Sequence, residues 1–303
     1  MSHSSTSVFV PAREASGAPR FSDFVELTKP RLSLMSVVSA VLGYFAAEPS
    51  TGWAAPVVVG LGCAFAAFGA GVLNQWWERD ADRLMRRTAD RPVASGRVAP
   101  ATALAYGVAL SATGVGVLFF GANAFASLLA LATVLLYVLL YTPMKGMTPW
   151  ALEVGALPGA LPPVIGWVAA GGGLSGLGWA LFAYLFVWQI PHFLAISWMC
   201  REDYRAGGFR MLAVSDTSGR SVARKAFLWT LLLVGVTFLP LAVVETGWLF
   251  LAAAVLLSAH ILAAAFAYLR RPASVPAARR LFGATLIHLP VYLSFLVVDR
   301  FIF

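Results

Sequence analysis

The chain has 303 residues, of which 59% are hydrophobic and only 12% are charged, and its mean hydropathy is +0.78. A soluble globular domain carries about twice that charged fraction, so the composition excludes a soluble enzyme and indicates a protein that crosses a membrane several times. The net charge of +8 would suit nucleic acid. In a membrane protein, however, an excess of arginine reports orientation, and we expect no nucleic-acid partner.

The N-terminal residues 1–23 are polar and rich in serine, and they lack the hydrophobic core of a secretory signal. We expect a disordered cytoplasmic tail there, followed by one intramembrane domain over residues 24–303. The two cysteines, Cys63 and Cys200, provide neither a disulfide framework nor a metal-binding spacing.

Nine apolar stretches follow, and apart from the short first one each is close to the roughly 20 residues that an α-helix needs to cross a bilayer. The fifth contains Pro158, Pro162 and Pro163, and helix breaks of this kind often line a cavity in membrane proteins. The predicted fold is therefore an all-α bundle of nine transmembrane helices. The stretches cover about residues 32–47, 53–74, 101–120, 123–142, 150–170, 179–199, 226–244, 247–269 and 281–298.

The distribution of lysine and arginine supports this helix count. The N-terminal tail and the loops after the second, fourth, sixth and eighth stretches hold 21 of the 22 basic residues, whereas Arg300 lies at the opposite end. By the positive-inside rule, the N-terminus is cytoplasmic and the C-terminus is outside. We expect a multi-pass protein of the inner (plasma) membrane whose functional site faces the cytoplasm.

The end of the second stretch carries Asn74, Glu78 and Asp82 at positions i, i+4 and i+8. A helix places these three side chains within roughly 80° of one another, while Asp80 points elsewhere. Such a stripe of oxygen atoms suits Mg²⁺, and the neighbouring arginines suit a phosphorylated ligand bridged through the metal. The spacing alone is equally compatible with a charge cluster that only fixes topology.

A second long charged loop follows the sixth stretch. In one continuous helix, His192 and Asp203 would lie about three turns apart on one face. Two facing acid-rich helix ends can enclose a metal-bound diphosphate, with Asp203 as the principal ligand. Glu202 is a weaker candidate, and an ion pair with Arg201 alone would also account for it. A histidine deep in a membrane helix is a functional candidate, although a hydrogen bond within the bundle would also account for it. His260 and His288 match no motif, and we expect hydrogen bonds between helices there.

Four stretches of the sequence form longer motifs: Asn74-x-x-x-Glu78-Arg-Asp80-x-Asp82-x-x-Met85-x-Arg87-Thr88-x-x-Arg91-Pro92, Tyr141-Thr142-Pro143-Met-Lys145, Pro158-Gly-Ala-Leu-Pro162-Pro163-x-Ile-Gly166-Trp167, and Trp188-Gln-x-Pro191-His192-Phe193 with Asp203-Tyr204-x-x-Gly207-Gly208. Together they resemble the UbiA-type intramembrane prenyltransferases. The Pro-His-Phe and Asp-Tyr elements point more narrowly to the haem O synthases, the protohaem IX farnesyltransferases. The resemblance covers about residues 24–300.

The resemblance implies a reaction between farnesyl diphosphate and haem b (protohaem IX) in the lipid bilayer. The bond from the prenyl carbon to diphosphate ionises, a haem vinyl group captures the allylic cation, and water completes the hydroxyethylfarnesyl group of haem O. Mg²⁺ is the implied cofactor, with haem A synthase or oxidase assembly factors as candidate partners. An aromatic or quinone precursor as the acceptor is the nearest alternative. A transporter would carry its acids at the bilayer midplane, and here they lie at one face.

Each candidate residue receives a role from this reading. Asn74, Glu78, Asp82 and Asp203 are expected to ligate the metal, and the three carboxylates among them are the catalytic candidates. The remaining substrate-binding candidates are Lys29, Arg31, Arg87 and Lys145 for diphosphate, His192 for haem, and Tyr141 and Trp188 as aromatic contacts.

Three positions depart from the family pattern. Glu78 stands where the family usually has aspartate, which lengthens the side chain by one methylene and keeps its charge. Ala151 occupies a position that is often asparagine, close to an unusual Glu153 whose role stays open. Gly207 stands where the wider superfamily has a second carboxylate, so we expect fewer metal ligands in the second motif.

Overall fold

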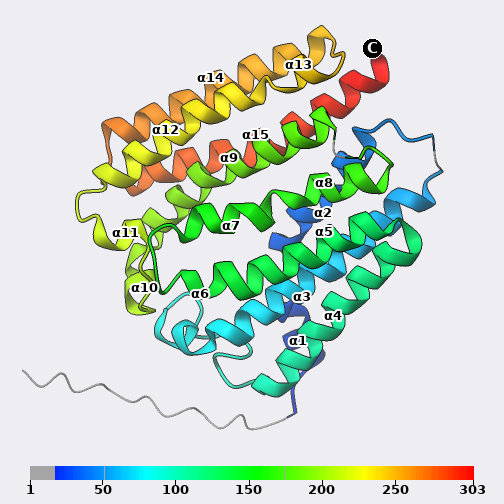
Figure 1. The fold of residues 1–303 in the computed structure, drawn as a ribbon. Helices are drawn as coiled ribbons and strands as arrows, with labels where there is room; N and C mark the ends of the chain where they lie inside the picture. Colours follow the sequence, from blue (N-terminus) through cyan, green and yellow to red (C-terminus); the bar gives the residue numbers. More distant parts are fainter. Residues whose placement is uncertain (1–17, 51, 174) are drawn as a thin grey trace, which may run out of the picture.

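The computed structural model describes residues 18–50, 52–173 and 175–303. This part of the chain contains helices, turns and loops, and no strand. Figure 1 shows the long helices lying side by side in one bundle. The elements are α1 (Phe21–Leu27), α2 (Pro30–Phe45), α3 (Ala54–Leu84), α4 (Pro100–Gly121), α5 (Ala124–Leu135), the π-helix η1 (Leu136–Tyr141), α6 (Thr142–Met144), α7 (Ala151–Gly159), α8 (Leu161–Ala169), α9 (Gly176–Met199), α10 (Arg201–Ala206), α11 (Leu212–Ser215), α12 (Arg220–Thr237), α13 (Pro240–Val243), α14 (Trp248–Arg270) and α15 (Val275–Ile302).

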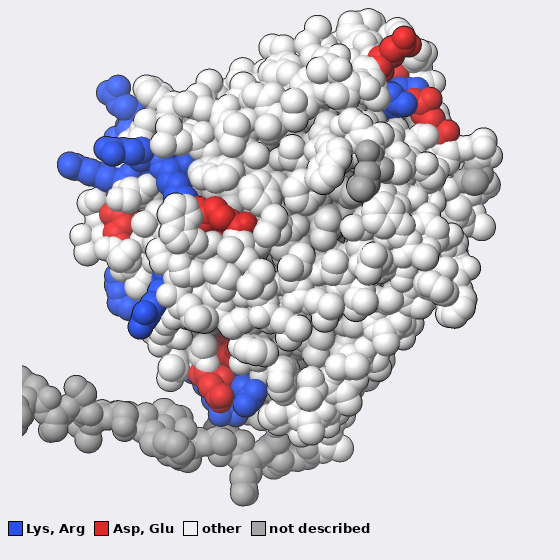
Figure 2. Space-filling model, in the orientation of Figure 1, with Lys and Arg blue, Asp and Glu red and all other residues white. Residues whose placement is uncertain are grey.

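Eight stretches of the described chain are long and apolar enough to cross a membrane, and α2 is a shorter apolar helix of 16 residues. The prediction of an all-α membrane protein is confirmed, while the count of nine spans and the orientation stay predictions. On the face drawn in Figure 2, most of the Lys and Arg residues lie at the end of the bundle where α6, α10 and α11 lie. The eight stretches are Ala54–Leu84, Pro100–Gly121, Ala124–Met144, Ala151–Ala169, Gly176–Met199, Arg220–Val243, Trp248–Arg270 and Val275–Ile302.

The expected tail over residues 1–23 falls mostly on residues 1–17, which lie outside the described residues. The expectation is wrong for its last three residues, which form the first turn of α1. Asp23 is buried, accepts a hydrogen bond from the backbone N–H of Arg20, and pairs with Arg97 from the loop before α4. A buried carboxylate with a cationic partner ties α1 to the bundle.

The expectation of one continuous helix from His192 to Asp203 is also wrong, because α9 ends at Met199 and α10 begins at Arg201. The guanidinium of Arg201 stacks on the Trp198 ring at 4.4 Å and donates to the Trp198 carbonyl at 3.1 Å. A continuing helix would offer that carbonyl to a later backbone N–H. The side chain replaces the backbone donor, and the helix stops.

Close contact between α3 and α4 depends on small residues. A Cβ at Gly69 would lie 2.2 Å from Oγ of Ser111, and one at Gly114 would lie 2.4 Å from the backbone nitrogen of Ala66. Membrane helices approach this closely only where glycine, alanine or serine line the interface. The interface fixes α3, which carries the first acidic motif.

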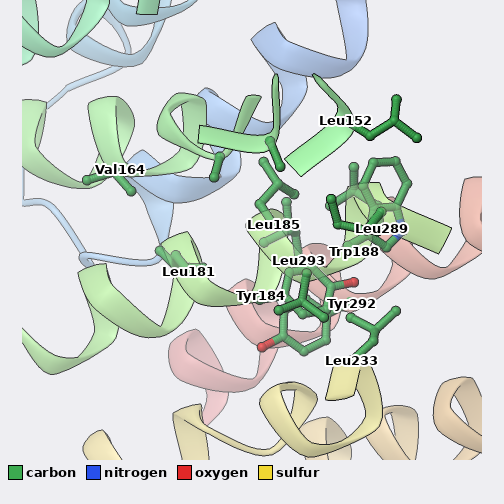
Figure 3. Packing of buried hydrophobic residues seen from close by; sticks show 14 of the residues in the cluster. Leu152, Val164, Leu181, Tyr184, Leu185, Trp188, Leu233, Leu289, Tyr292 and Leu293 are labelled. Carbon is green, nitrogen blue, oxygen red and sulfur yellow. The ribbon is translucent and has the colours of Figure 1, made fainter. Parts of the chain in front are cut away.

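Helix α9 packs against α7, α8, α12 and α15. Figure 3 shows Tyr184 and Trp188 of α9 among leucines of the neighbouring helices, with Tyr184 against Tyr292 of α15. The two tyrosine rings stack with centroids 3.6 Å apart. This packing holds the part of α9 that carries His192 rigidly against α15.

The turn before α12 provides a test of local stability. Asp216 accepts hydrogen bonds from the backbone N–H groups of Ser218, Gly219 and Val222 and from the Ser218 hydroxyl. Burial raises the pKa of Asp216, but these hydrogen bonds outweigh it and hold the pKa below its ordinary value of 3.8. The Asp216→Ala variant should lose about 1 kcal/mol of stability at pH 7, measured by thermal unfolding in detergent.

The carboxylate contributes this stability above its ordinary pKa of 3.8 and loses it as the pH falls through the lowered value. The difference between the wild type and Asp216→Ala should therefore shrink in acid. Glu245→Ala removes an exposed acid that has no hydrogen bond or ion pair within the described chain, and it serves as the control. An equal difference at pH 3 and pH 7 would contradict the prediction.

Candidate active site

The acidic stripe, defined as Asn74, Glu78 and Asp82, faces the interior of the bundle because α3 continues as a helix to Leu84. Its three side chains are buried, and Asp82 is fully enclosed. In the same helical turn the side chain of Asp80 is 70% exposed, and its ion pairs within the described chain are with the surface residues Arg79 and Arg83. The stripe predicted from the i, i+4, i+8 spacing is thus a buried feature, and Asp80 is not part of it.

Each member of the acidic stripe contacts one cationic side chain from another part of the chain. The contacts are Lys29 Nζ donating to Asn74 Oδ1 at 2.8 Å, Lys145 Nζ pairing with Glu78 Oε1 at 2.8 Å, and Arg91 Nη1 donating to both carboxylate oxygens of Asp82 at 2.8 Å. Three basic side chains therefore face two carboxylates. The excess of positive charge favours an anionic ligand.

Lys145 contacts two aromatic rings through its side chain and another loop through its backbone. Its Nζ lies 4.6 Å from the centroid of the Tyr141 ring and 6.0 Å from that of Phe209, and its carbonyl accepts the N–H of Arg210 at 2.8 Å. Burial lowers the pKa of Lys145, but the carboxylate of Glu78 outweighs burial and the pKa lies above its usual range. Lys145 therefore stays a cation at the site.

Lys29 lies between α1 and α2 in a left-handed backbone conformation with φ of 48°. Burial lowers the pKa of Lys29 to about 7, the nearby charge of Arg91 adds to this effect, and Glu78 opposes it. Near pH 7 Lys29 is therefore only partly protonated, and a negatively charged group bound beside it would favour its cationic form.

The π-helix η1 connects the site to the span that precedes Lys145. Asn74 donates from Nδ2 to the Thr142 hydroxyl at 3.3 Å, and that hydroxyl donates to the Tyr137 carbonyl at 2.8 Å. The rings of Tyr137 and Tyr141 lie 5.3 Å apart. π-Helical turns are frequent at functional sites, and this one brings Thr142 to the acidic stripe.

Asp203 lies at the edge of the site rather than within it. Its Oδ1 accepts the backbone N–H of Arg86 at 3.1 Å, just after α3 ends, and Gly207 of the same segment packs against Met85. The structure therefore brings the two acidic motifs to one end of the bundle. Arg31 and Arg87 are exposed, and neither makes a hydrogen bond or ion pair within the described chain.

Acidic and histidine side chains in the described ranges do not form a cluster of three or more that could hold a metal by themselves. Mg²⁺ does not need one, because it commonly takes one or two carboxylates and completes its shell with water and phosphate oxygens. The amide oxygen of Asn74 and the carboxylates of Glu78 and Asp82 are ligands of this kind. The donor set fits Mg²⁺ as a bridge to a phosphorylated ligand.

His192 lies seven residues before the end of α9, which is about 10 Å along the helix axis. Its Nδ1 is 2.8 Å from the hydroxyl of Thr285 in α15, and its ring stacks on Trp188 with centroids 4.9 Å apart. His288 instead pairs through Nδ1 with the Tyr184 hydroxyl at 2.7 Å, which is the expected hydrogen bond between helices.

Sequence reasoning gave no role to several residues that the structure brings to these positions: Arg91, Tyr137, Thr142, Phe209 and Thr285. Arg91 and Thr142 carried a usable signal, since each stands in one of the quoted motifs. Glu153, whose role the sequence left open, forms an ion pair with Lys225 of α12, and Lys225 Nζ lies 4.6 Å from the Trp150 ring centroid. This pair links α7 to α12.

The model of the UbiA prenyltransferase family matches residues 36–287. The chain belongs to this family. Among relatives of this UbiA family member, the protoheme IX farnesyltransferase of Opitutus terrae is 42% identical over 281 residues, which cover 93% of this chain and 95% of that protein. The resemblance stated from the motifs is therefore confirmed.

Solved structures agree on the fold of this UbiA prenyltransferase. A structure of digeranylgeranylglyceryl phosphate synthase matches with a TM-score of 0.74 at 16% identity, covering 93% of this chain and 99% of the other. A UbiA homologue from Archaeoglobus fulgidus bound to GPP and Mg²⁺ matches with a TM-score of 0.66 at 15% identity, covering 90% of this chain and 99% of the other. At these low sequence identities, the structural similarity is evidence for a shared fold alone.

Proposed function

We propose that this protein transfers the farnesyl group of farnesyl diphosphate to a vinyl group of haem b, giving haem O. The observation that carries the proposal is the arrangement toward one end of the bundle: a buried acidic stripe with three basic partners, and His192 in α9, about 10 Å before the end of that helix. The extent of the identity to a protoheme IX farnesyltransferase supports it. We place the protein in the plasma membrane with this end facing the cytoplasm.

The diphosphate end of the substrate would bind at the acidic stripe. Lys29, Lys145 and Arg91 would exchange their contacts with α3 for contacts with phosphate oxygens and offset the charge that grows on the leaving group. Bound Mg²⁺, held by the acidic stripe with Asp203 as a further candidate ligand, would supply Lewis acidity toward the same oxygens.

The prenyl end would lie against aromatic faces. Tyr141 is buried directly beneath Lys145, and Tyr137 packs beside it on η1. Aromatic faces stabilise a cation by their negative quadrupole, and a site poor in water protects an allylic cation from hydrolysis. The cation would then be captured by the haem vinyl group, and addition of water with loss of a proton would give the hydroxyethylfarnesyl product.

Haem would be held deeper in the bundle by His192, with the Trp188 ring beside it. Imidazole nitrogen is a common axial ligand of haem iron. If the acceptor were an aromatic or quinone precursor without a metal, His192 would have no metal to bind and would serve only through its hydrogen bond to Thr285.

Incubation of membranes that contain the protein with farnesyl diphosphate and haem b, followed by mass analysis of the porphyrin, tests the proposal. We expect haem that carries a hydroxyethylfarnesyl group, and we expect chelation of Mg²⁺ to abolish the product. Parallel incubations with aromatic acids and quinone precursors test the alternative. Prenylation of one of these, with haem b unmodified, would contradict the proposal.

A further inference from the structure

We infer that Thr285 is a positioning residue that sets the tautomer of His192 and presents its Nε2 lone pair to haem iron. The inference rests on the proposed function, because it concerns how that site holds haem. Thr285 is fully buried on α15 and is bonded to His192 of α9 across the interface.

The direction of the hydrogen bond follows from the proton of the threonine hydroxyl. That hydroxyl has a single proton, and it donates to the Phe282 carbonyl at 2.6 Å. With its proton on that carbonyl, the hydroxyl accepts from His192 at 2.8 Å. In this arrangement Nδ1 of His192 carries the ring proton, and in the neutral imidazole Nε2 then carries the lone pair.

Thr285 also fixes the ring next to the histidine. Its backbone carbonyl accepts the indole N–H of Trp188 at 2.9 Å, and Trp188 stacks on the imidazole at an interplanar angle of 21°. Phe282, one turn earlier on α15, packs against the same imidazole, and the two ring centroids are 4.9 Å apart. One residue thus orients the histidine through its side chain and the tryptophan through its backbone. Metal-binding histidines are commonly held this way through the other ring nitrogen.

The second nitrogen of His192 is free to bind a ligand. Nε2 has no hydrogen-bond partner in the described part of the chain, and it retains accessible surface. His288 gives the contrast, since its Nδ1 is also held, by Tyr184, but its Nε2 is sealed in the core without a partner. Of these two buried histidines, His192 is the one that combines a held Nδ1 with an accessible Nε2.

Titration of the purified full-length protein with haemin, followed by absorption and EPR spectroscopy, tests the inference. The Thr285→Val variant keeps the shape and the backbone carbonyl but removes the acceptor for Nδ1–H. We expect it to raise the Kd for haemin about 10- to 100-fold and to weaken the histidine-ligated spectrum. Thr285→Ser, which restores the hydroxyl, should return both to the wild-type values.

Two further variants separate the possible failures. Tyr184→Phe removes the Nδ1 partner of His288 in the same way and should leave the haemin spectrum unchanged. His192→Ala should abolish the nitrogen-ligated spectrum, and if it does not, the haem role of His192 in the proposed function fails. If His192→Ala abolishes the spectrum while Thr285→Val matches the wild type, the inference about Thr285 alone is overturned.

A measurement without haem covers the case in which Thr285→Val folds poorly. Solid-state NMR of the wild-type protein labelled with ¹⁵N-histidine reads which ring nitrogen carries the proton. We expect a neutral His192 protonated on Nδ1, assigned by its absence in His192→Ala. A proton on Nε2 would overturn the inference.

Discussion

Replacing Asp82 by asparagine is expected to lower the rate of farnesyl transfer at least about 100-fold while the protein still inserts into the membrane. Asp82 is fully buried, and both of its oxygens accept from Arg91. The amide keeps the shape but removes the negative charge that balances Arg91 and attracts Mg²⁺. Single-turnover transfer in nanodiscs, measured over a range of Mg²⁺ concentrations, checks the prediction, and the concentration of Mg²⁺ for half-maximal rate should rise.

Asp80→Asn is the matched control, because it makes the same chemical change two residues earlier in the same motif. Asp80 is exposed and pairs with Arg79 and Arg83 at the surface, where ion pairs contribute little. Its rate should stay within about twofold of the wild type. Equal losses in the two variants would show that the motif acts through its overall charge, and the buried acidic stripe would lose its assigned role.

The Lys145→Met variant is expected to raise the KM for farnesyl diphosphate about 10- to 100-fold, which is the loss of one charged hydrogen bond to a phosphate oxygen. Lys145 is the buried partner of Glu78 and lies over Tyr141, so methionine keeps the contact with the ring and removes the charge. Steady-state assays with saturating haem b measure the change.

Lys225→Met provides an unusually close control. Lys225 also pairs with a glutamate of another helix, Glu153, and also lies 4.6 Å from an aromatic ring centroid, that of Trp150. Both variants lose an ion pair between helices and a cation–π contact, but only Lys145 belongs to the candidate site. An increase in KM for Lys225→Met as large as that for Lys145→Met would assign the effect to bundle stability.

Local rules predicted the acidic stripe well. The i, i+4, i+8 spacing requires only that α3 remain helical, and the charged residues after Leu73 are compatible with a helix that leaves the membrane. The same rules failed at Cys200, where the side chain of Arg201 caps the Trp198 carbonyl and ends α9. Helical periodicity carries no information about a side chain that competes for a backbone acceptor.

Contacts between segments that lie far apart in the chain could not be predicted from the sequence. Arg91 returns to Asp82 through the loop after α3, and Thr142 meets Asn74 because the π-helical turn changes the register of its span. Thr285 lies 93 residues from His192. A pattern read along one helix identifies the face that a residue occupies, but the partner on that face depends on tertiary packing.

The ion pairs of the acidic stripe also bear on turnover. After each reaction cycle pyrophosphate must leave a site that was built to attract it, and a vacated cluster of cations inside a protein would be costly. Here Lys145 and Arg91 each pair with a carboxylate of α3, and Lys29 donates to the neutral amide oxygen of Asn74, so departure of the product leaves each basic side chain with a local hydrogen-bond partner. Under the proposed function, Glu78 and Asp82 would act as counter-ions once pyrophosphate leaves, which would lower the barrier to product release that strong diphosphate binding imposes.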